Sequence, residues 1–213
     1  MNKSIEECVF PDKLKLADIY RVYPIHKKDD RNSAGNYRPV SVLPYASKLY
    51  ERIIKEQTEN NIDSFLSGNL CGYRKGFSVQ HAIISMTEKW RKILDNKGFA
   101  GAVLMDLSKA FDCMDHELLI AKLSAYGFDK NALKCIKSYL TNRWQRVKVD
   151  TEFSNWFELT LGVPQGSVLG PLLFNIYLND LLWFTKDCEV CNFADDTTIF
   201  ACNKDIDEMK NTL

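Results

Sequence analysis

The stretch CNFADDTTIF, residues 191–200, places two adjacent carboxylates, Asp195 and Asp196, between aromatic and β-branched residues. Apolar residues of these kinds on both sides of a short polar pair predict a strand, a tight turn and a second strand. Neighbouring aspartates repel each other unless a cation lies between them, so the pair indicates a divalent metal site at the tip of a hairpin. The pair alone also fits a solvated turn, because Asp favours turns through hydrogen bonds to its own backbone.

A third carboxylate, Asp106, stands near the end of the short apolar run GAVLMDL, residues 101–107. Such a run predicts a buried strand, and a lone buried charge is costly without a partner. If this strand lies beside the hairpin, Asp106 and Asp195 can share metal ions. Two ions roughly 3.5–4 Å apart can activate an attacking hydroxyl and stabilise a leaving phosphate oxygen. The three acids therefore indicate the chemistry of nucleotide polymerisation.

Five short motifs occur in a fixed order along the chain: NYRPVSVL at 36–43, GYRKGFS at 72–78, DLSKAFD at 106–112, GVPQGSVLGP at 162–171 and FADD at 193–196. Each motif alone is a weak signal. Together, in this order and over most of the chain, they resemble the reverse transcriptase domain of non-LTR (LINE-like) retrotransposons. The resemblance implies RNA-directed DNA synthesis, in which the 3′-hydroxyl of a DNA primer attacks a dNTP selected by an RNA template.

The same resemblance implies roles for individual residues. Asp106, Asp195 and Asp196 would be the catalytic carboxylates and would hold Mg²⁺, with Mn²⁺ as the alternative ion. Phe111 would pack beneath the sugar of the bound nucleotide, where a 2′-hydroxyl would collide with its ring; the alternative is an aromatic that only fills the corner between strand and helix. Gln165 and Gly166 would lie against the template base and the new nucleotide.

Four basic residues are predicted to bind substrate: Arg38, Lys48, Arg52 and Arg74. Guanidinium groups match phosphate geometry, so Arg38, Lys48 and Arg52 are expected along the route of template phosphate or incoming triphosphate. For Lys48 and Arg52, a solvated helix face explains the charges nearly as well. The family commonly has Gln before the first Gly of the second motif, whereas this chain has Cys71, so a hydrogen bond from that amide is not expected.

Hydrophobic periodicity and turn residues predict a succession of helices and strands, and their order resembles the α+β fold of reverse transcriptases, in which mixed helix–strand fingers precede a ferredoxin-like palm. Helices are expected from Ser47 to Leu66 before Gly68, from the cap Ser78 to Asp95, from the cap Asp115 to Gly127, and at 131–140. Strands are expected at 19–25, 101–107, 146–149, 157–160 and on both sides of the Asp195-Asp196 turn.

Residues 1–100 are expected to form a fingers-like region and residues 101–213 a palm-like region, together one reverse transcriptase domain. Only 17 residues follow Asp196, so the helical thumb of the family is expected to be absent. Thumb and endonuclease segments would be supplied elsewhere in the full element. The alternative function is that of a catalytically inactive, truncated remnant that binds nucleic acid or a partner protein.

Composition is consistent with an intracellular globular protein, nuclear or cytoplasmic. With 213 residues and 46% hydrophobic content the chain can bury a large core, and it contains neither a run of about 18 apolar residues nor an apolar signal core. Seven cysteines without regular spacing indicate reduced thiols. Residues 1–100 carry 17 basic and 12 acidic side chains (+5) and residues 101–213 carry 11 and 16 (−5), so a net charge of zero conceals a basic half suited to phosphate and an acidic half suited to metal.

Overall fold

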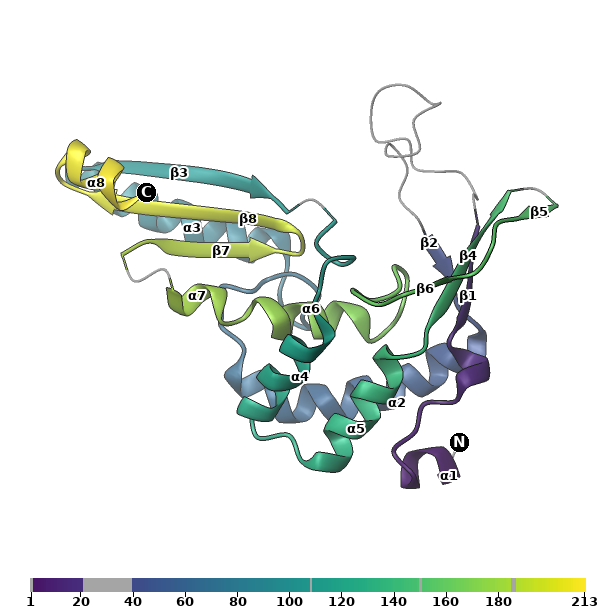
Figure 1. The fold of residues 1–213 in the computed structure, drawn as a ribbon. Coiled ribbons are helices and arrows are strands. Elements are labelled where there is room, and N and C mark those ends of the chain that lie inside the picture. The colour runs from purple at the N-terminus through teal and green to yellow at the C-terminus, as the bar shows by residue number, and fades with distance from the viewer. Residues whose placement is uncertain (1, 21–39, 108, 150, 185–186) are drawn as a thin grey trace. The chain divides into compact units, whose positions relative to one another are not determined.

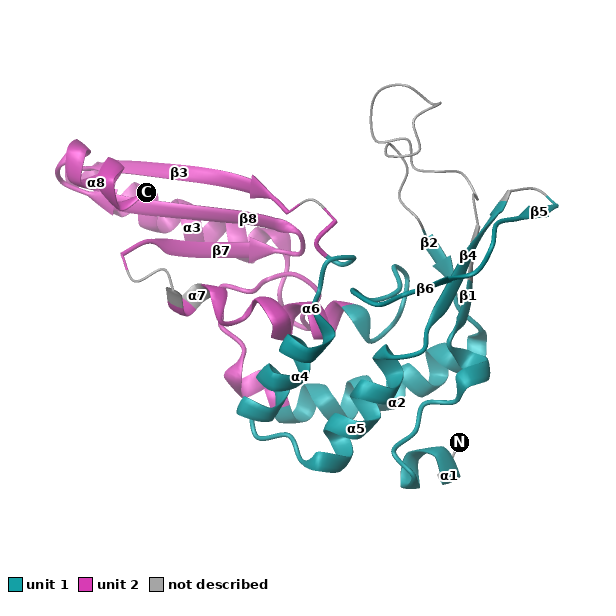
Figure 2. Ribbon diagram, in the orientation of Figure 1, with its two compact units in different colours: residues 1–61, 111–170 teal, residues 62–110, 171–213 magenta. Residues whose placement is uncertain are grey.

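The computed structural model describes residues 2–20, 40–107, 109–149, 151–184 and 187–213 (Figure 1). The chain divides into two compact units, each built from two separated segments (Figure 2). Unit 1 comprises residues 1–61 and 111–170, and unit 2 comprises residues 62–110 and 171–213. The division into fingers and palm near residue 100 is a different partition, and it stays a prediction.

Unit 1 contains a five-stranded sheet in which β1 (Leu16–Tyr20) pairs antiparallel with β2 (Val40–Val42) and parallel with β4 (Trp144–Val149). The short strands β5 (Glu152–Phe153) and β6 (Phe157–Glu158) pair antiparallel with β4. The strand predicted at 146–149 is confirmed, and the one predicted at 157–160 is a strand only at 157–158. Residues 21–25 of the strand predicted at 19–25 lie outside the described residues.

The helices of unit 1 are α1 (Asn2–Glu6), α2 (Tyr45–Ile62, whose last residue belongs to unit 2), α4 (His116–Ala125) and α5 (Lys130–Leu140), with a 3₁₀ turn at Asp12–Leu14. Asp115 caps α4 as predicted, since its Oδ1 accepts a hydrogen bond of 2.7 Å from the Leu118 amide. In the core, the ring of Phe10 lies edge-on to Tyr50 of α2 and Tyr139 of α5, at centroid distances of 4.9 and 5.1 Å.

Unit 2 contains a three-stranded antiparallel sheet with β8 (Asp196–Asn203) between β3 (Phe99–Asp106) and β7 (Glu189–Phe193). β7 and β8 form the predicted hairpin, joined by a two-residue turn at Ala194 and Asp195. Figure 1 shows these strands side by side, with α3 (Val79–Asp95) behind them. The other helices are α6 (Gly170–Leu178, which begins at the last residue of unit 1), α7 (Leu181–Phe184) and α8 (Ile206–Thr212), and residues Asp63–Phe65 form a 3₁₀ turn.

Helix α3, predicted from the sequence, packs on this sheet through an apolar stripe. Ala82, Met86 and Trp90 join a cluster with Phe200 of β8, whose ring lies edge-on to Trp90 at a centroid distance of 5.9 Å. The expected side-chain cap at Ser78 is wrong. The Ser78 hydroxyl lies 3.0 Å from His81 Nδ1 and makes no cap bond to a backbone amide.

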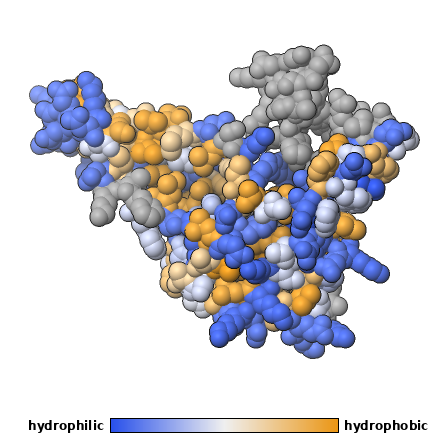
Figure 3. Space-filling view, viewed as in Figure 1, coloured by the Kyte–Doolittle hydropathy of each residue, from blue (hydrophilic) through white to orange (hydrophobic). Residues whose placement is uncertain are grey.

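The prediction that residues 101–107 form a buried strand is wrong as to burial. Leu104 is 80% exposed and Val103 is 44% exposed. Side chains of a strand point alternately to the two faces of the sheet, so their burial depends on what packs on each face, and the face of β3 that carries Ala102, Leu104 and Asp106 is exposed. Figure 3 shows hydrophobic surface, in orange, over the three-stranded sheet of unit 2.

No helix in the described part of the chain combines the length and the apolar character needed to cross a membrane.

Candidate active site

The antiparallel register of β3 and β8 places Asp106 directly opposite Asp196. Residues that pair in this way project their side chains from the same face of the sheet, with Cβ atoms about 4.5–5.5 Å apart. Asp196 and Asp106 are both exposed, and Asp195, partly buried, precedes Asp196 in the turn. Two carboxylates that are 90 residues apart in the sequence thus meet at one end of the sheet, and the third is adjacent.

Like charges directly opposite each other on neighbouring strands destabilise a sheet unless something compensates them. A divalent cation bound by carboxylate oxygens is such a compensation, and oxygen ligands are those that Mg²⁺ prefers. Across the described ranges, however, no three His, Cys, Asp or Glu side chains form a group that could hold a metal ion. The structure therefore brings Asp106 and Asp196 together, and the metal role of the three aspartates stays a prediction.

The segment after the 3₁₀ turn, residues 69–72, lies beside the tip of the Asp195-Asp196 hairpin. Leu70 forms a parallel β-bridge with Asn192 of β7. The Asn192 amide donates to the Asn69 carbonyl, and the Cys71 amide donates to the Asn192 carbonyl, both at 2.9 Å. Gly72 then packs so closely on the turn that a Cβ atom at this position would lie 2.9 Å from Ala194 Cα and still closer to the Ala194 nitrogen. Glycine is required here because the backbone of one segment rests on the backbone of the other.

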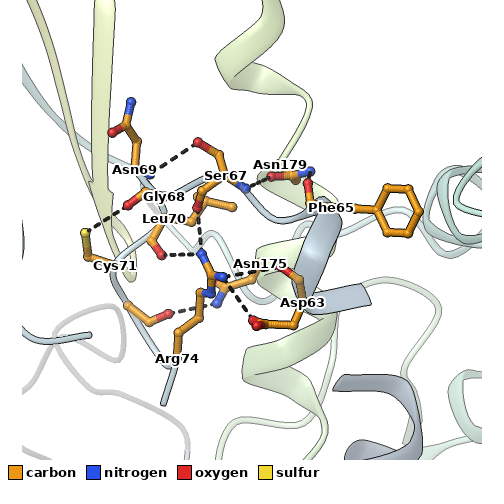
Figure 4. Close-up of polar contacts among 11 residues, drawn as sticks. Asp63, Phe65, Ser67, Gly68, Asn69, Leu70, Cys71, Arg74, Asn175 and Asn179 are labelled. Atoms are coloured by element: carbon orange, nitrogen blue, oxygen red, sulfur yellow. Dashed lines mark hydrogen bonds and ion pairs between the residues drawn. The ribbon is translucent and has the colours of Figure 1, made fainter. Parts of the chain in front are cut away.

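Side chains from α6 and from Arg74 hold this segment in place (Figure 4). Asn175 Nδ2 donates to the Gly72 carbonyl at 2.8 Å, and Asn179 Oδ1 accepts from the Ser67 amide at 2.9 Å. The guanidinium of Arg74 donates to the Ser67 carbonyl at 2.6 Å and pairs with Asp63 at 2.9 Å.

These contacts occupy the Arg74 side chain, which is only 9% exposed. They give Arg74 a structural role beneath the hairpin, and its predicted role in substrate binding is untested. Cys71, which replaces the Gln common in the family, is buried beside Cys191 in the cluster under α3. Burial raises the pKa of the Cys71 thiol above its ordinary value, as expected of a core residue.

Sequence reasoning missed the asparagines of this site. Asn192 and Asn175 are buried, and Asn192 Nδ2 donates to Thr197 Oγ1 at 2.9 Å, across the hairpin. The available signal was an amide side chain inside an apolar run, as in VCNF at 190–193 and LLFNIYL at 172–178. Since a buried amide must find hydrogen-bond partners, each of these residues indicates a specific backbone or side-chain contact.

Unit 1 carries residues 162–166, Gly-Val-Pro-Gln-Gly, on the loop before α6. Gln165 Nε2 donates to both carboxylate oxygens of Asp112, at 3.0 and 3.2 Å, and the Gln165 carbonyl accepts from the Ser41 amide of β2 at 2.9 Å. Gly166 is exposed and has a φ of 98°, a conformation that residues with a Cβ atom rarely adopt. The side chain of Gln165 is therefore held at its end, and the backbone at Gly166 is open to solvent.

The same loop is joined to the segment that follows Asp106 in the sequence. The Phe111 carbonyl accepts from the Val163 amide at 3.0 Å, and the Met114 carbonyl accepts from the Gly162 amide at 2.7 Å. Phe111 and Gln165 thus lie on two directly bonded segments of unit 1. The ring of Phe111 is partly buried, and its predicted contact with a nucleotide sugar is untested.

Lys48 and Arg52 are exposed on α2, a position that fits both a solvated helix face and a phosphate contact. Arg38 lies outside the described residues.

Comparison with known proteins gives one family and a set of related transposon proteins. Residues 25–213 match the family described as "Reverse transcriptase (RNA-dependent DNA polymerase)". The "Probable RNA-directed DNA polymerase from transposon BS" of Drosophila melanogaster is 35% identical over 177 residues, which are 81% of this chain and 19% of the relative. The "RNA-directed DNA polymerase from mobile element jockey" of the same organism is 28% identical over 216 residues, 96% of this chain and 23% of the relative. The chain spans about a fifth of the length of these curated relatives.

Solved structures of similar fold include apo telomerase from Candida tropicalis truncated from its C-terminal domain. The TM-score is 0.62 at 15% sequence identity, and the match covers 96% of this chain and 47% of that chain. Apo telomerase from the same organism gives a TM-score of 0.55 at 12% identity, over 87% of this chain and 42% of that chain. At these identities the likeness concerns the fold alone.

Proposed function

Because the chain belongs to the reverse transcriptase (RNA-dependent DNA polymerase) family, we propose that it extends a DNA primer on an RNA template, with Asp106, Asp195 and Asp196 as the catalytic carboxylates. The predicted resemblance to the reverse transcriptase domain of non-LTR retrotransposons is confirmed by the relatives from transposon BS and jockey. The observation that carries the proposal is the register of β3 and β8, which sets Asp106 opposite Asp196.

The donor set of this site fits Mg²⁺, since it consists of carboxylate oxygens at a strand end where Asp106 and Asp196 are exposed. Asp106, Asp195 and Asp196 would hold the ions. Two divalent ions, when bound, activate the attacking 3′-hydroxyl and stabilise charge on the leaving phosphate oxygen. Mn²⁺ has the same preference for oxygen ligands and is the alternative ion.

Residues of unit 1 supply the selection of the nucleotide in this proposal. Gln165, held through Asp112, presents the adjacent exposed Gly166 backbone to the template base and the incoming dNTP. Phe111 fills the space where a ribose 2′-hydroxyl would lie. Lys48 and Arg52 remain candidates for phosphate contact, and Arg38 shares that assignment on the basis of its motif.

Primer extension tests the proposal. Purified protein is incubated with a DNA primer annealed to an RNA template, dNTPs and Mg²⁺, and the product is measured with and without chelator. Asp106→Asn and Asp195→Asn should each lower the extension rate at least about 100-fold, because each removes a charged ligand worth several kcal/mol in the transition state. Asp95→Asn is the matched control, since Asp95 is an exposed residue of the same unit that pairs only with the exposed Arg91 among the described residues.

A second candidate function is nucleic-acid binding without catalysis. It is favoured by the lack, among the residues that the structure describes, of a three-ligand group able to hold a metal ion. Protein that binds primer–template but extends no primer, and whose binding is unaffected by Asp106→Asn, would support this second function and contradict the first.

A further inference from the structure

Glu51 of α2 is a fully buried carboxylate, and two of its hydrogen-bond donors lie 117 and 118 residues away in the sequence. Its Oε2 accepts hydrogen bonds from the Val168 amide at 2.7 Å and the Leu169 amide at 3.2 Å. Its Oε1 accepts from the Ser47 hydroxyl one turn earlier in α2, at 3.0 Å. These three hydrogen bonds stabilise the buried carboxylate, and the buried Tyr139 lies close enough for Glu51 to help raise the pKa of its phenol.

The two amides bound by Glu51 immediately precede α6, which begins at Gly170. The first amides of a helix have no carbonyl partner within the helix, and a negative charge near them is favourable. Ser167 Oγ accepts from the Gly170 amide at 3.1 Å. The carboxylate of another helix and a local hydroxyl therefore satisfy the amides that lead into α6.

Gly166 lies between two sets of hydrogen bonds that hold its loop, one to Glu51 and the other to Ser41. On one side the Gln165 carbonyl is bound by the Ser41 amide of β2, and on the other the Val168 and Leu169 amides are bound by Glu51. Only Ser167 and Gly166 itself separate the two sets of bonds. The φ of 98° at Gly166 is thus maintained from both sides, and a Cβ atom there would meet the Ser41 carbonyl oxygen at 3.1 Å.

We propose that Glu51 is a positioning residue for nucleotide selection: by bonding the Val168 and Leu169 amides it fixes the Gln165-Gly166 turn in the conformation that receives the incoming dNTP. The inference rests on the proposed function, because it assigns the nucleotide to this turn. Glu51 acts through the loop and does not itself touch substrate. An amide side chain at this position cannot replace it, since the carboxylate oxygen that accepts from two amides would become either a donor or a weaker, uncharged acceptor.

The test uses the 213-residue chain and three substitutions. Glu51→Gln keeps the shape of the side chain and removes its charge, and Glu51→Asp keeps the charge but shortens its reach. Ser47→Ala removes only the bond to Oε1 and leaves both loop bonds, so it is the matched control inside the same cluster. Glu56→Gln is the control for charge alone, because Glu56 is exposed on the same helix.

Amide hydrogen exchange of Val168 and Leu169, followed by NMR, measures how well their hydrogen bonds to Glu51 protect these amides, and it does not require catalysis. Glu51→Gln should accelerate exchange about 10-fold to 100-fold, Glu51→Asp should accelerate it less, and both controls should stay within about threefold of the unsubstituted protein. Unchanged exchange in Glu51→Gln would overturn the proposal.

Nucleotide affinity is measured with primer–template whose primer lacks a 3′-hydroxyl, from the shift of the Gly166 amide signal on addition of the complementary dNTP and Mg²⁺. Glu51→Gln should raise the apparent Kd for dNTP about tenfold and leave the Kd for primer–template within about twofold. Faster loop exchange with an unchanged Kd for dNTP would make Glu51 a purely structural support and overturn its positioning role. A Gly166 signal that does not respond to dNTP in the unsubstituted protein would overturn it as well.

Extension of an ordinary primer separates this inference from the proposed function. If dNTP binds at the turn with the expected dependence on Glu51 but no primer is extended, polymerisation is refuted and the role of Glu51 stands. If primers are extended and the Glu51 variants bind dNTP normally, polymerisation stands and the role of Glu51 is refuted.

Discussion

Gly72→Ala should displace the Asp195-Asp196 turn without touching either aspartate. The added methyl carbon would lie 2.9 Å from Ala194 Cα and 3.2 Å from the Phe193 carbonyl carbon, whereas carbon atoms in contact are normally about 3.5–4.0 Å apart. Relief of the first contact alone requires a movement of roughly 0.6–1.1 Å. The neighbouring atoms are backbone, so no flexible side chain can move aside.

The segment that carries Gly72 cannot easily withdraw. Its carbonyl is held by Asn175, and the Cys71 amide before it is bonded to Asn192. The turn must therefore move, and Asp195 moves with it. Overpacking of this kind costs about 1–3 kcal/mol in the free energy of unfolding, and a displacement of about 1 Å at a reacting centre can lower the rate about 100-fold.

The assay compares Gly72→Ala with Gly68→Ala in primer extension, urea unfolding and the NMR amide shifts of Asp195 and Asp196. Gly68→Ala is the matched control, because a Cβ atom at Gly68 has no neighbour within 4 Å. We expect a loss of activity about 100-fold in Gly72→Ala and little change in Gly68→Ala. Equal activity and equal turn signals in the two variants would refute the argument that Gly72 sets the position of the catalytic turn.

Three further predictions address other parts of the chain. Phe111→Ala should relax discrimination against ribonucleotides by opening space below the sugar, measured as the ratio of dNTP to rNTP incorporation; an unchanged ratio would leave Phe111 as a core residue only. Arg74→Ala should lower the free energy of unfolding by about 2 kcal/mol, because it leaves the partly buried Ser67 carbonyl without this donor and removes the ion pair with Asp63, whereas Arg91→Ala on the exposed face of α3 should change it by less than about 0.5 kcal/mol in the same urea titration. Burial and the neighbouring Cys71 raise the pKa of the Cys191 thiol from 9.0 to about 11, so the neutral thiol contributes stability that is fully present below pH 9 and is lost between pH 9 and about 11. Mass spectrometry after treatment with iodoacetamide at pH 8 should therefore find the exposed Cys113 alkylated and Cys191 protected, and equal labelling in the folded protein would contradict this.

The sequence by itself determined the family and most of the local structure. The Asp195-Asp196 hairpin and the Asp115 cap were both predicted correctly. Each depends on residues within a few positions of one another, such as an Asp oxygen that reaches an amide three residues on. The family resemblance also needed no structure, because it rests on the order of five short motifs.

Contacts between distant segments could be decided only by the tertiary structure. Asp106 was predicted to lie near the hairpin, but its exact partner, Asp196, follows from the register of two strands that are far apart in the sequence. The role of Gly72 depends on its approach to Ala194, and nothing in the local sequence around Gly72 indicates that neighbour.

The exposure of β3 and the burial of Glu51 have the same physical origin. An apolar run predicts a strand but does not show whether its two faces are covered, since burial depends on which elements pack on each face of the sheet. Likewise a Glu on an amphipathic helix is expected in solvent, and its burial is possible only because a loop more than 100 residues away brings two unpaired amides to it. Local preference depends on neighbours in the chain, whereas the energy of a buried charge or a close backbone contact depends on neighbours in space, which only the folded chain brings together.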